Sequence, residues 1–131
     1  MEPTLVTAPE LLTVLAELKR QEPVFHTSEF GVTRMDFEEK TAEDFWEVGA
    51  SGRRYSRDFI LDTLESRVPQ PEEAGWETSE FHCLEIARDN FLLTYTLSQG
   101  ARMTRRATIW RRTAAGWKIL YHQGTIVETV A

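Results

Sequence analysis

The second half of the chain contains four long strand-like segments separated by very short polar turns. The segments are rich in aromatic and β-branched residues and cover approximately 76–87, 91–98, 103–113 and 117–125. The turns between them are Arg88-Asp89-Asn90, Gln99-Gly100 and Ala114-Ala115-Gly116. Connections of two or three residues join only antiparallel neighbours, so this half of the chain predicts an antiparallel meander.

The first half of the chain predicts three helices and one hairpin. We expect helices to begin after Thr7, Thr33 and Ser56, because these hydroxyl residues cap helix N-termini well. Thr7 and Thr33 are each followed three residues later by an acidic residue, which is the spacing of a capping box. The first helix should run to about residue 22 and the second to about residue 41. An aromatic segment over 44–49 and a tight turn then predict a strand and a hairpin before the third helix.

This element order predicts an α+β fold. The helices are segregated from the meander instead of alternating with it, which favours helices packed in a curved, mainly antiparallel sheet of about six strands. We expect residues 1–131 to form a single conical domain. Phe91-Leu92-Leu93 and Ile119-Leu120-Tyr121 are apolar on both faces, so the outer face of the sheet also needs a cover. A second copy of the chain is the simplest cover, and we predict a homodimer through the sheet.

The charge of the chain is unevenly distributed. The net charge is −6, but residues 101–131 contain six basic residues and one acidic residue. Strand alternation places Arg105 and Arg111 on one face and Arg106 and Arg112 on the other, so they do not form one phosphate-binding stripe. We therefore expect no nucleic-acid partner.

Three further features limit the class of protein. Cys83 is the only cysteine, so the chain has neither an internal disulfide nor a cysteine pair for zinc. The N-terminal residues have neither a basic segment nor a long apolar run, as a signal peptide would. No stretch approaches the ~20 apolar residues that span a bilayer. We expect a soluble, cytoplasmic protein without a membrane partner.

Two groups of residues resemble a known superfamily. Residues 45–53, Phe-Trp-Glu-Val-Gly-Ala-Ser-Gly-Arg, resemble the first hairpin of a bacterial family of unknown function within the nuclear-transport-factor-like (NTF2-like) superfamily. Ile109-Trp110-Arg111-Arg112, Gly116-Trp117-Lys118-Ile119 and His122-Gln123-Gly124-Thr125 resemble the last two strands of the same family. The resemblance implies a cone with a central pocket. The superfamily includes ketosteroid isomerases, SnoaL-like cyclases and ligand-binding domains, so the resemblance predicts fold and not reaction.

Glu47 is the first candidate for chemistry. It lies among Phe45, Trp46 and Val48, where partial burial would raise its pKa towards that of a general base. The alternative is that Glu47 faces solvent or pairs with an arginine of the strand over 103–113. The expected first helix contains no tyrosine, so the phenol that the resemblance to ketosteroid isomerases would imply there is missing.

His122 is the second candidate, and Gln123 follows it. A neutral imidazole could transfer protons, and the amide of Gln123 could orient a carbonyl group or a water molecule. The alternative is a structural histidine near the end of an apolar strand. His26 and His82 complete the histidines, and no pair has the i,i+4 spacing of a metal site, so we expect neither a metal nor another cofactor.

Five further side chains are candidates for binding a ligand. One of the arginine pairs on the strand over 103–113 should reach inward, towards Glu47 or an anionic ligand. Aromatic residues are more often core than ligand contacts, but in a conical fold the core and the cavity lining nearly coincide. The ligand-binding candidates are Trp46, Tyr95, Arg106, Trp110 and Gln123.

Three functions are compatible with these residues. The first is a small-molecule-binding domain with an aromatic-lined pocket around Glu47 and His122, and the sequence leaves open whether it is an enzyme. The second is a cofactor-independent lyase or isomerase that uses Glu47 or His122 as its base. The third is a dimerisation or interaction module whose cavity is filled by side chains such as Trp46 and Trp110.

Overall fold

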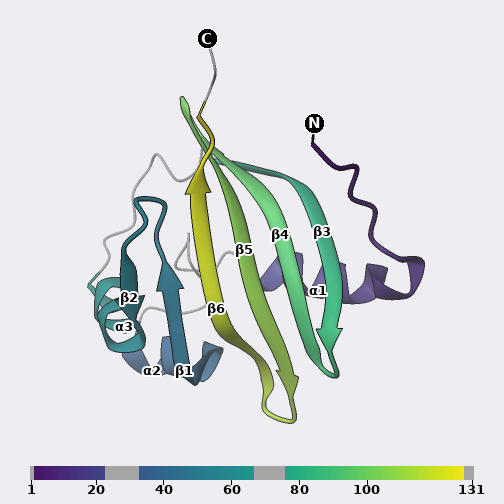
Figure 1. Ribbon diagram of the computed structural model, residues 1–131. Coiled ribbons are helices and arrows are strands. Elements are labelled where there is room, and N and C mark those ends of the chain that lie inside the picture. Colours follow the sequence, from purple (N-terminus) through teal and green to yellow (C-terminus); the bar gives the residue numbers. More distant parts are fainter. Residues whose placement is uncertain (1, 23–32, 67–75, 129–131) are drawn as a thin grey trace.

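The computed structural model describes residues 2–22, 33–66 and 76–128. A 3₁₀ turn at Pro9–Leu11 leads into α1 (Leu12–Gln21), and α2 (Arg34–Lys40) and α3 (Arg57–Glu65) flank a short hairpin. The strands are β1 (Thr41–Val48), β2 (Arg54–Ser56), β3 (Glu77–Ala87), β4 (Asn90–Gln99), β5 (Arg102–Thr113) and β6 (Gly116–Ile126). Figure 1 shows a curved sheet with α1 behind β3 and β4 and with α2 and α3 beside β1 and β2. The predicted α+β class is confirmed.

The six strands form one mixed sheet in the order β2-β1-β6-β5-β4-β3. Strands β3 to β6 make the predicted antiparallel meander, and their bounds agree with the expected segments to within about two residues. Strand β1 pairs with β6 in parallel and with β2 antiparallel. This parallel pair brings the first strand of the chain beside the last strand, a contact that no local pattern predicts.

Two of the three predicted helix caps are confirmed. Thr33 and Asp36 form a capping box, and the Ser56 hydroxyl accepts a hydrogen bond from the amide of Phe59. The prediction for Thr7 was wrong, because Ala8 precedes the 3₁₀ turn and makes no side-chain cap. The Thr7 hydroxyl instead accepts a 3.2 Å hydrogen bond from the amide of Cys83. Since β3 is an edge strand, that amide has no partner strand on this side and takes the hydroxyl in its place.

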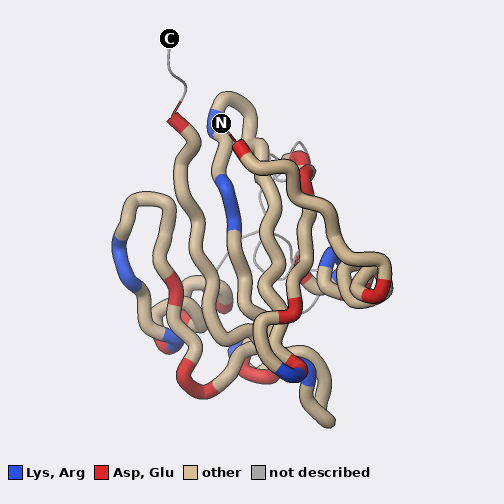
Figure 2. The backbone as a smooth tube through the Cα atoms, turned by 45° about the vertical axis from the view of Figure 1, so that its right-hand side comes forward, with Lys and Arg blue, Asp and Glu red and all other residues tan. Residues whose placement is uncertain are grey.

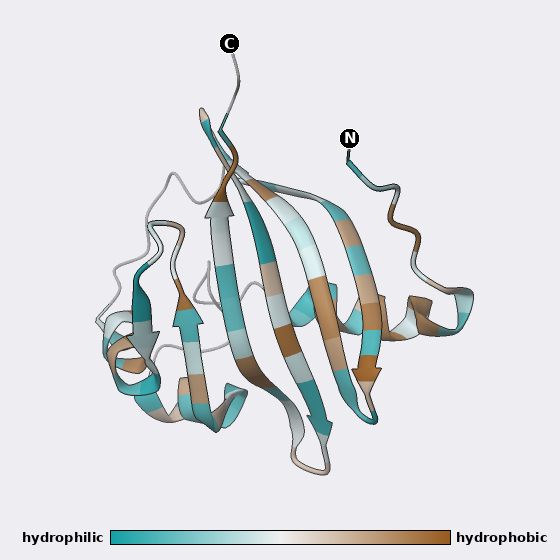
Figure 3. Cartoon of the chain, in the orientation of Figure 1, coloured by the Kyte–Doolittle hydropathy of each residue, from teal (hydrophilic) through white to brown (hydrophobic). Residues whose placement is uncertain are grey.

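The hydrophobic core lies between the helices and the inner face of the sheet, which is the face that contacts them. Alternation on β4 turns its large side chains inward, where they pack against side chains of the three helices. Figure 3 shows hydrophobic, brown bands on the central strands of the sheet. The most deeply buried are Leu18, Phe37, Leu61, Phe91, Leu93, Leu97, Trp110 and Ile119.

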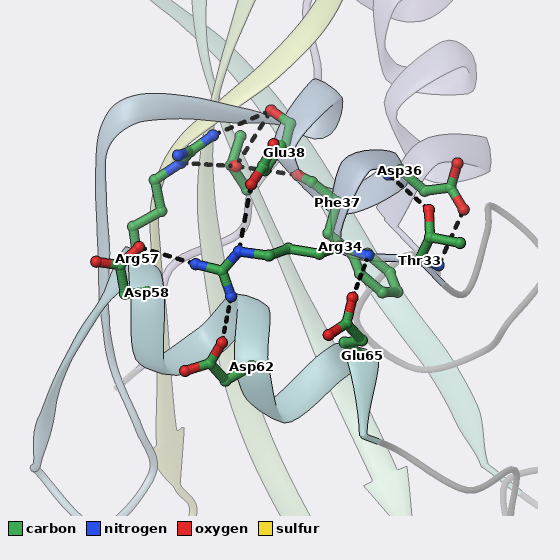
Figure 4. Close-up of polar contacts among 10 residues, drawn as sticks. Thr33, Arg34, Asp36, Phe37, Glu38, Arg57, Asp58, Asp62 and Glu65 are labelled. Atoms are coloured by element: carbon green, nitrogen blue, oxygen red, sulfur yellow. Dashed lines mark hydrogen bonds and ion pairs between the residues drawn. The ribbon is translucent and has the colours of Figure 1, made fainter.

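Ionic contacts join the two short helices beside β1. Arg34 of α2 pairs with Glu38 on its own helix and with Asp58 and Asp62 of α3, and its amide bonds the Glu65 carboxylate (Figure 4). These groups are mostly exposed, so each contact stabilises the fold only slightly. Elsewhere, acidic and basic residues are interspersed along the backbone (Figure 2).

Several expectations lie outside the described residues. They concern His26 and its place after the first helix. Within residues 2–22, 33–66 and 76–128, no helix is both long and apolar enough to cross a membrane.

Candidate functional site

An inner cavity of about 240 Å³ lies between α3 and the inner face of the sheet. Strands β1, β4, β5 and β6 each contribute one polar side chain to its lining, and α3 contributes most of the apolar part. The polar strand residues are Glu47, Gln99, Arg106 and His122; the remaining lining residues are Ile60, Thr63, Leu64 and Trp76.

Glu47 lies directly opposite His122 in the parallel β1–β6 pair. Burial raises the pKa of the Glu47 carboxyl to about 7, against the opposing effect of the positive charge on Arg106. Within the described part of the chain, no hydrogen bond or ion pair engages this carboxyl group. Glu47 is therefore a cavity carboxyl group that both accepts and releases a proton near neutral pH.

Arg106 extends over the inner face of the sheet towards β6. Its Nε donates a 2.9 Å hydrogen bond to the buried Thr104 hydroxyl, and its Nη1 lies 3.5 Å from His122 Nε2. Gly124 makes room for the guanidinium group, since a Cβ at this position would lie 3.2 Å from Arg106 Cζ. Burial lowers the pKa of Arg106, but an arginine stays protonated at any physiological pH.

His122 is almost fully buried and belongs to a chain of hydrogen bonds beneath the cavity. Its Nδ1 lies 2.7 Å from Thr108 Oγ1, and the Thr108 hydroxyl donates a 2.6 Å bond to Glu22 Oε1. A hydroxyl has only one proton, so while Glu22 is ionised and accepts that proton, Thr108 accepts from Nδ1–H. In the neutral imidazole, the lone pair is therefore on Nε2, which faces Arg106.

Glu22 is the buried end of this chain, at the C-terminus of α1. Besides Thr108, its carboxylate accepts hydrogen bonds from the Tyr95 hydroxyl at 2.8 Å and from Trp110 Nε1 at 2.9 Å. Burial raises the Glu22 pKa to about 7, and these hydrogen bonds oppose the rise because they favour the charged form. Burial also raises the pKa of Tyr95, and the negative charge on Glu22 adds to this effect.

Glu22 is absent from the residues predicted from the sequence, although its position in the first helix contains a signal. Val14, Leu18 and Glu22 follow one another at a spacing of four residues, and all three are buried. A carboxylate at the C-terminus of a helix also opposes the helix dipole. A charged residue that continues the apolar stripe of a helix indicates a buried polar contact.

The structure separates the predicted site residues into three groups. Glu47, His122 and Arg106 lie together at the inner cavity, and Tyr95 and Trp110 lie beneath it as partners of Glu22. Trp46 and Gln123 do not line this cavity, because strand alternation turns them to the opposite, outer face. There Trp46 contacts the ring of Tyr121 at 4.8 Å, and Gln123 accepts a hydrogen bond from the hydroxyl of the same tyrosine.

A larger hollow of about 480 Å³ lies on the outer face, beside the N-terminal residues. Of its charged residues, Arg105 donates to Glu80 and Glu2, and only Arg106, which also lines the inner cavity, has no ion pair in the described part of the chain. The inner cavity is smaller, but it holds the carboxyl and guanidinium groups without ion-pair partners in the described part. We therefore place the candidate site at the inner cavity. In residues 2–22, 33–66 and 76–128, no group of three or more metal-ligating side chains comes together.

Comparison with solved structures identifies the fold. A protein of unknown function from the DUF3225 family of Pectobacterium atrosepticum superposes with a TM-score of 0.67 at 17% identity, over 98% of this chain and 99% of that chain. A cystatin-like fold protein from Burkholderia xenovorans gives 0.66 at 12% identity, over 91% and 95% of the two chains. A suggested ketosteroid isomerase from Parabacteroides distasonis gives 0.62 at 16% identity, over 99% and 96%.

The chain therefore has the conical NTF2-like, or cystatin-like, fold, as the resemblance in its sequence implied. No protein-family model matches the sequence, and no curated protein matches it significantly. At identities of 12–17%, the structural similarity establishes the fold alone.

Proposed function

We propose that this protein binds a small organic molecule in the inner cavity. The observation that carries the proposal is the Glu47 carboxyl group, which lines the cavity without a hydrogen-bond partner in the described part of the chain. The Oε1 atom of Gln99 on the same lining is buried and has no hydrogen-bond partner among the described residues. Such a group destabilises the folded state, so its presence at a cavity indicates a partner that arrives from solution. Arg106 and His122 would meet the polar end of such a molecule, and Ile60 and Leu64 its apolar end.

The cavity volume limits the size of the molecule. At about 240 Å³, the cavity is below the roughly 300 Å³ at which sites for drug-sized ligands begin. A single substituted ring or a short branched chain fits this volume, whereas a steroid does not. This limit argues against the steroid substrates of the enzymes that share the fold.

Cofactor-independent proton transfer, as in a lyase or isomerase, is the second candidate function. It is favoured by the pKa of about 7 at Glu47, since a general base is most effective when its pKa is near the working pH. The relay from His122 through Thr108 to Glu22 would orient the imidazole next to it. A pure interaction module has less support, because it gives no role to a carboxyl group that lines a cavity.

Titration with three small probes, benzoate, benzamide and benzyl alcohol, tests the proposal. We expect at least one probe to shift the NMR signals of Glu47, His122 and Ile60, and Glu47→Gln to change its affinity. Glu43→Gln is the matched control, because Glu43 is an exposed carboxylate of the same strand. If no probe shifts a residue of the inner cavity, or if all shifts fall on the outer face, the proposed site is wrong.

A further inference from the structure

We infer that the molecule held in the inner cavity is a small carboxylate that binds the guanidinium group of Arg106 and donates a hydrogen bond to Gln99. This inference rests on the proposed function and adds the chemical class of the ligand. It depends on three features of the cavity: an arginine without an ion pair, the space that surrounds it, and a buried acceptor.

Arg106 differs from the arginines that form ion pairs with acidic residues. Arg34, Arg105 and Arg112 each lie within 4 Å of a carboxylate oxygen, whereas no such pair includes Arg106 in the described residues. Its Nε is bonded to Thr104, its Nη1 has only a 3.5 Å contact, and no described residue bonds its Nη2. The two terminal nitrogens thus present the planar fork that binds a carboxylate with two parallel hydrogen bonds.

The guanidinium group is also held in place before any ligand arrives. Thr104 is fully buried and fixes the Nε end, and the absence of a side chain at Gly124 leaves the space that the guanidinium occupies. A Cβ at position 124 would lie 3.2 Å from both Cζ and Nη1, which is tighter than ordinary van der Waals contact. An arginine fixed in this way loses little conformational entropy on binding an anion.

Gln99 supplies the second polar contact. Its Oε1 atom is buried, lines the same cavity region and has no hydrogen-bond partner among the described residues. An amide oxygen only accepts hydrogen bonds, so the group that satisfies it must be a donor. The ligand would therefore carry a hydroxyl or N–H group in addition to its carboxylate.

The other charges around the cavity are compatible with an anion. Glu47 on β1 is the carboxyl group of the described lining, and Arg106 on β5 and His122 on β6 line the same cavity, with Glu22 at the end of α1 behind them. Because Glu47 exchanges its proton near neutral pH, it can become neutral when an anion binds. Binding of a carboxylate should then take up part of a proton, and binding of a neutral molecule should not.

A comparison of benzoate with benzamide tests the inference, because the two probes have the same shape and differ in charge. We expect benzoate to bind the wild-type protein at least about tenfold more tightly, as one charge-assisted pair predicts. Arg106→Gln should abolish this preference, and Gly124→Ala, which displaces the guanidinium, should reduce it. Arg105→Gln is the control, since Arg105 is the next residue of the same strand, points to the other face and is paired with Glu80 and Glu2.

Calorimetry in two buffers of different ionisation enthalpy provides a measurement that does not depend on an Arg106 variant. Benzoate should bind with proton uptake at pH 7, and Glu47→Gln should remove the uptake. Among the three monohydroxybenzoates, at least one should bind more tightly than benzoate, and Gln99→Leu should cancel that gain.

The possible outcomes separate the two proposals. If benzamide or benzyl alcohol binds in the cavity as tightly as benzoate, the assignment of a carboxylate is wrong and the cavity remains a binding site. If benzoate binds better but Arg106→Gln keeps the preference, Arg106 is not its anchor and the inference also fails. If no probe reaches the cavity, both proposals fail.

Discussion

The Glu47→Gln substitution should change how stability depends on pH. In the folded protein the pKa of Glu47 is about 7, whereas an unperturbed carboxyl group has a value of 4.5. Between these two values the folded state binds more protons than the unfolded chain, so stability falls as the pH rises from about 4.5 to about 7. Gln is neutral at every pH and has nearly the same shape as Glu, so the variant should not lose this stability as the pH rises.

The magnitude follows from the size of the shift. Each pKa unit corresponds to about 1.4 kcal/mol, so the rise from 4.5 to about 7 corresponds to about 3 kcal/mol. The free energy of unfolding of Glu47→Gln, relative to the wild type, should therefore increase by about 3 kcal/mol between pH 4.5 and pH 8. Most of this change should occur below pH 7, at about 1.4 kcal/mol per pH unit.

Urea denaturation of both proteins at several pH values from 4.5 to 8 measures this difference directly. Glu43→Gln serves as a control, because it removes one negative charge from an exposed position on the same strand. A difference between Glu47→Gln and the wild type that stays constant over the whole range would show that burial does not perturb Glu47. In that case the carboxyl group is solvated, and the reasoning that places it at the centre of the site is refuted.

Three further predictions concern the surroundings of the site and the sheet. Tyr95→Phe removes a hydrogen bond to the Glu22 carboxylate and should lower the free energy of unfolding by about 1–3 kcal/mol. The loss should be larger at pH 8 than at pH 5, because this hydrogen bond favours the charged form of Glu22. Urea denaturation at both pH values measures the difference. Ser56→Ala should cost about 1 kcal/mol in the same assay, because it removes the N-cap of α3, and an unchanged midpoint would contradict the cap. We also propose that the outer face of the sheet, where Trp46 and Leu84 are more than 40% exposed, pairs with a second copy of the chain. Sedimentation velocity should then show a dimer that Leu84→Lys dissociates, and a monomeric wild-type protein at micromolar concentration would refute it.

Part of the candidate site was predictable from the sequence. Glu47 and His122 were identified because a carboxyl group and an imidazole on apolar strands are unusual, and Arg106 because alternation separates it from Arg105. Their proximity was not predictable, because it depends on the parallel pairing of β1 with β6. Glu22 was missed, although its place on the apolar stripe of α1 was a signal.

The sequence also does not show which residues of a strand lie on the inner face of the sheet and which on the outer face. Alternation predicts which residues of a strand share a face, but not which of the two faces is covered by helices. Trp46 and Glu47 are adjacent and were both predicted as site residues, yet only Glu47 lines the inner cavity. Their assignment depends on where the helices pack, and that depends on contacts between distant segments.

By itself, the sequence determined the elements and the neighbours that short turns impose. The caps at Thr33 and Ser56 and the turns of the meander depend on residues within a few positions of each other, and local conformational preferences act at that range. Only the tertiary structure decided which side chains meet, since the contact between Glu22 and Tyr95 joins residues 73 positions apart. Such contacts form because the whole core must be buried at once, and no segment contains this information alone.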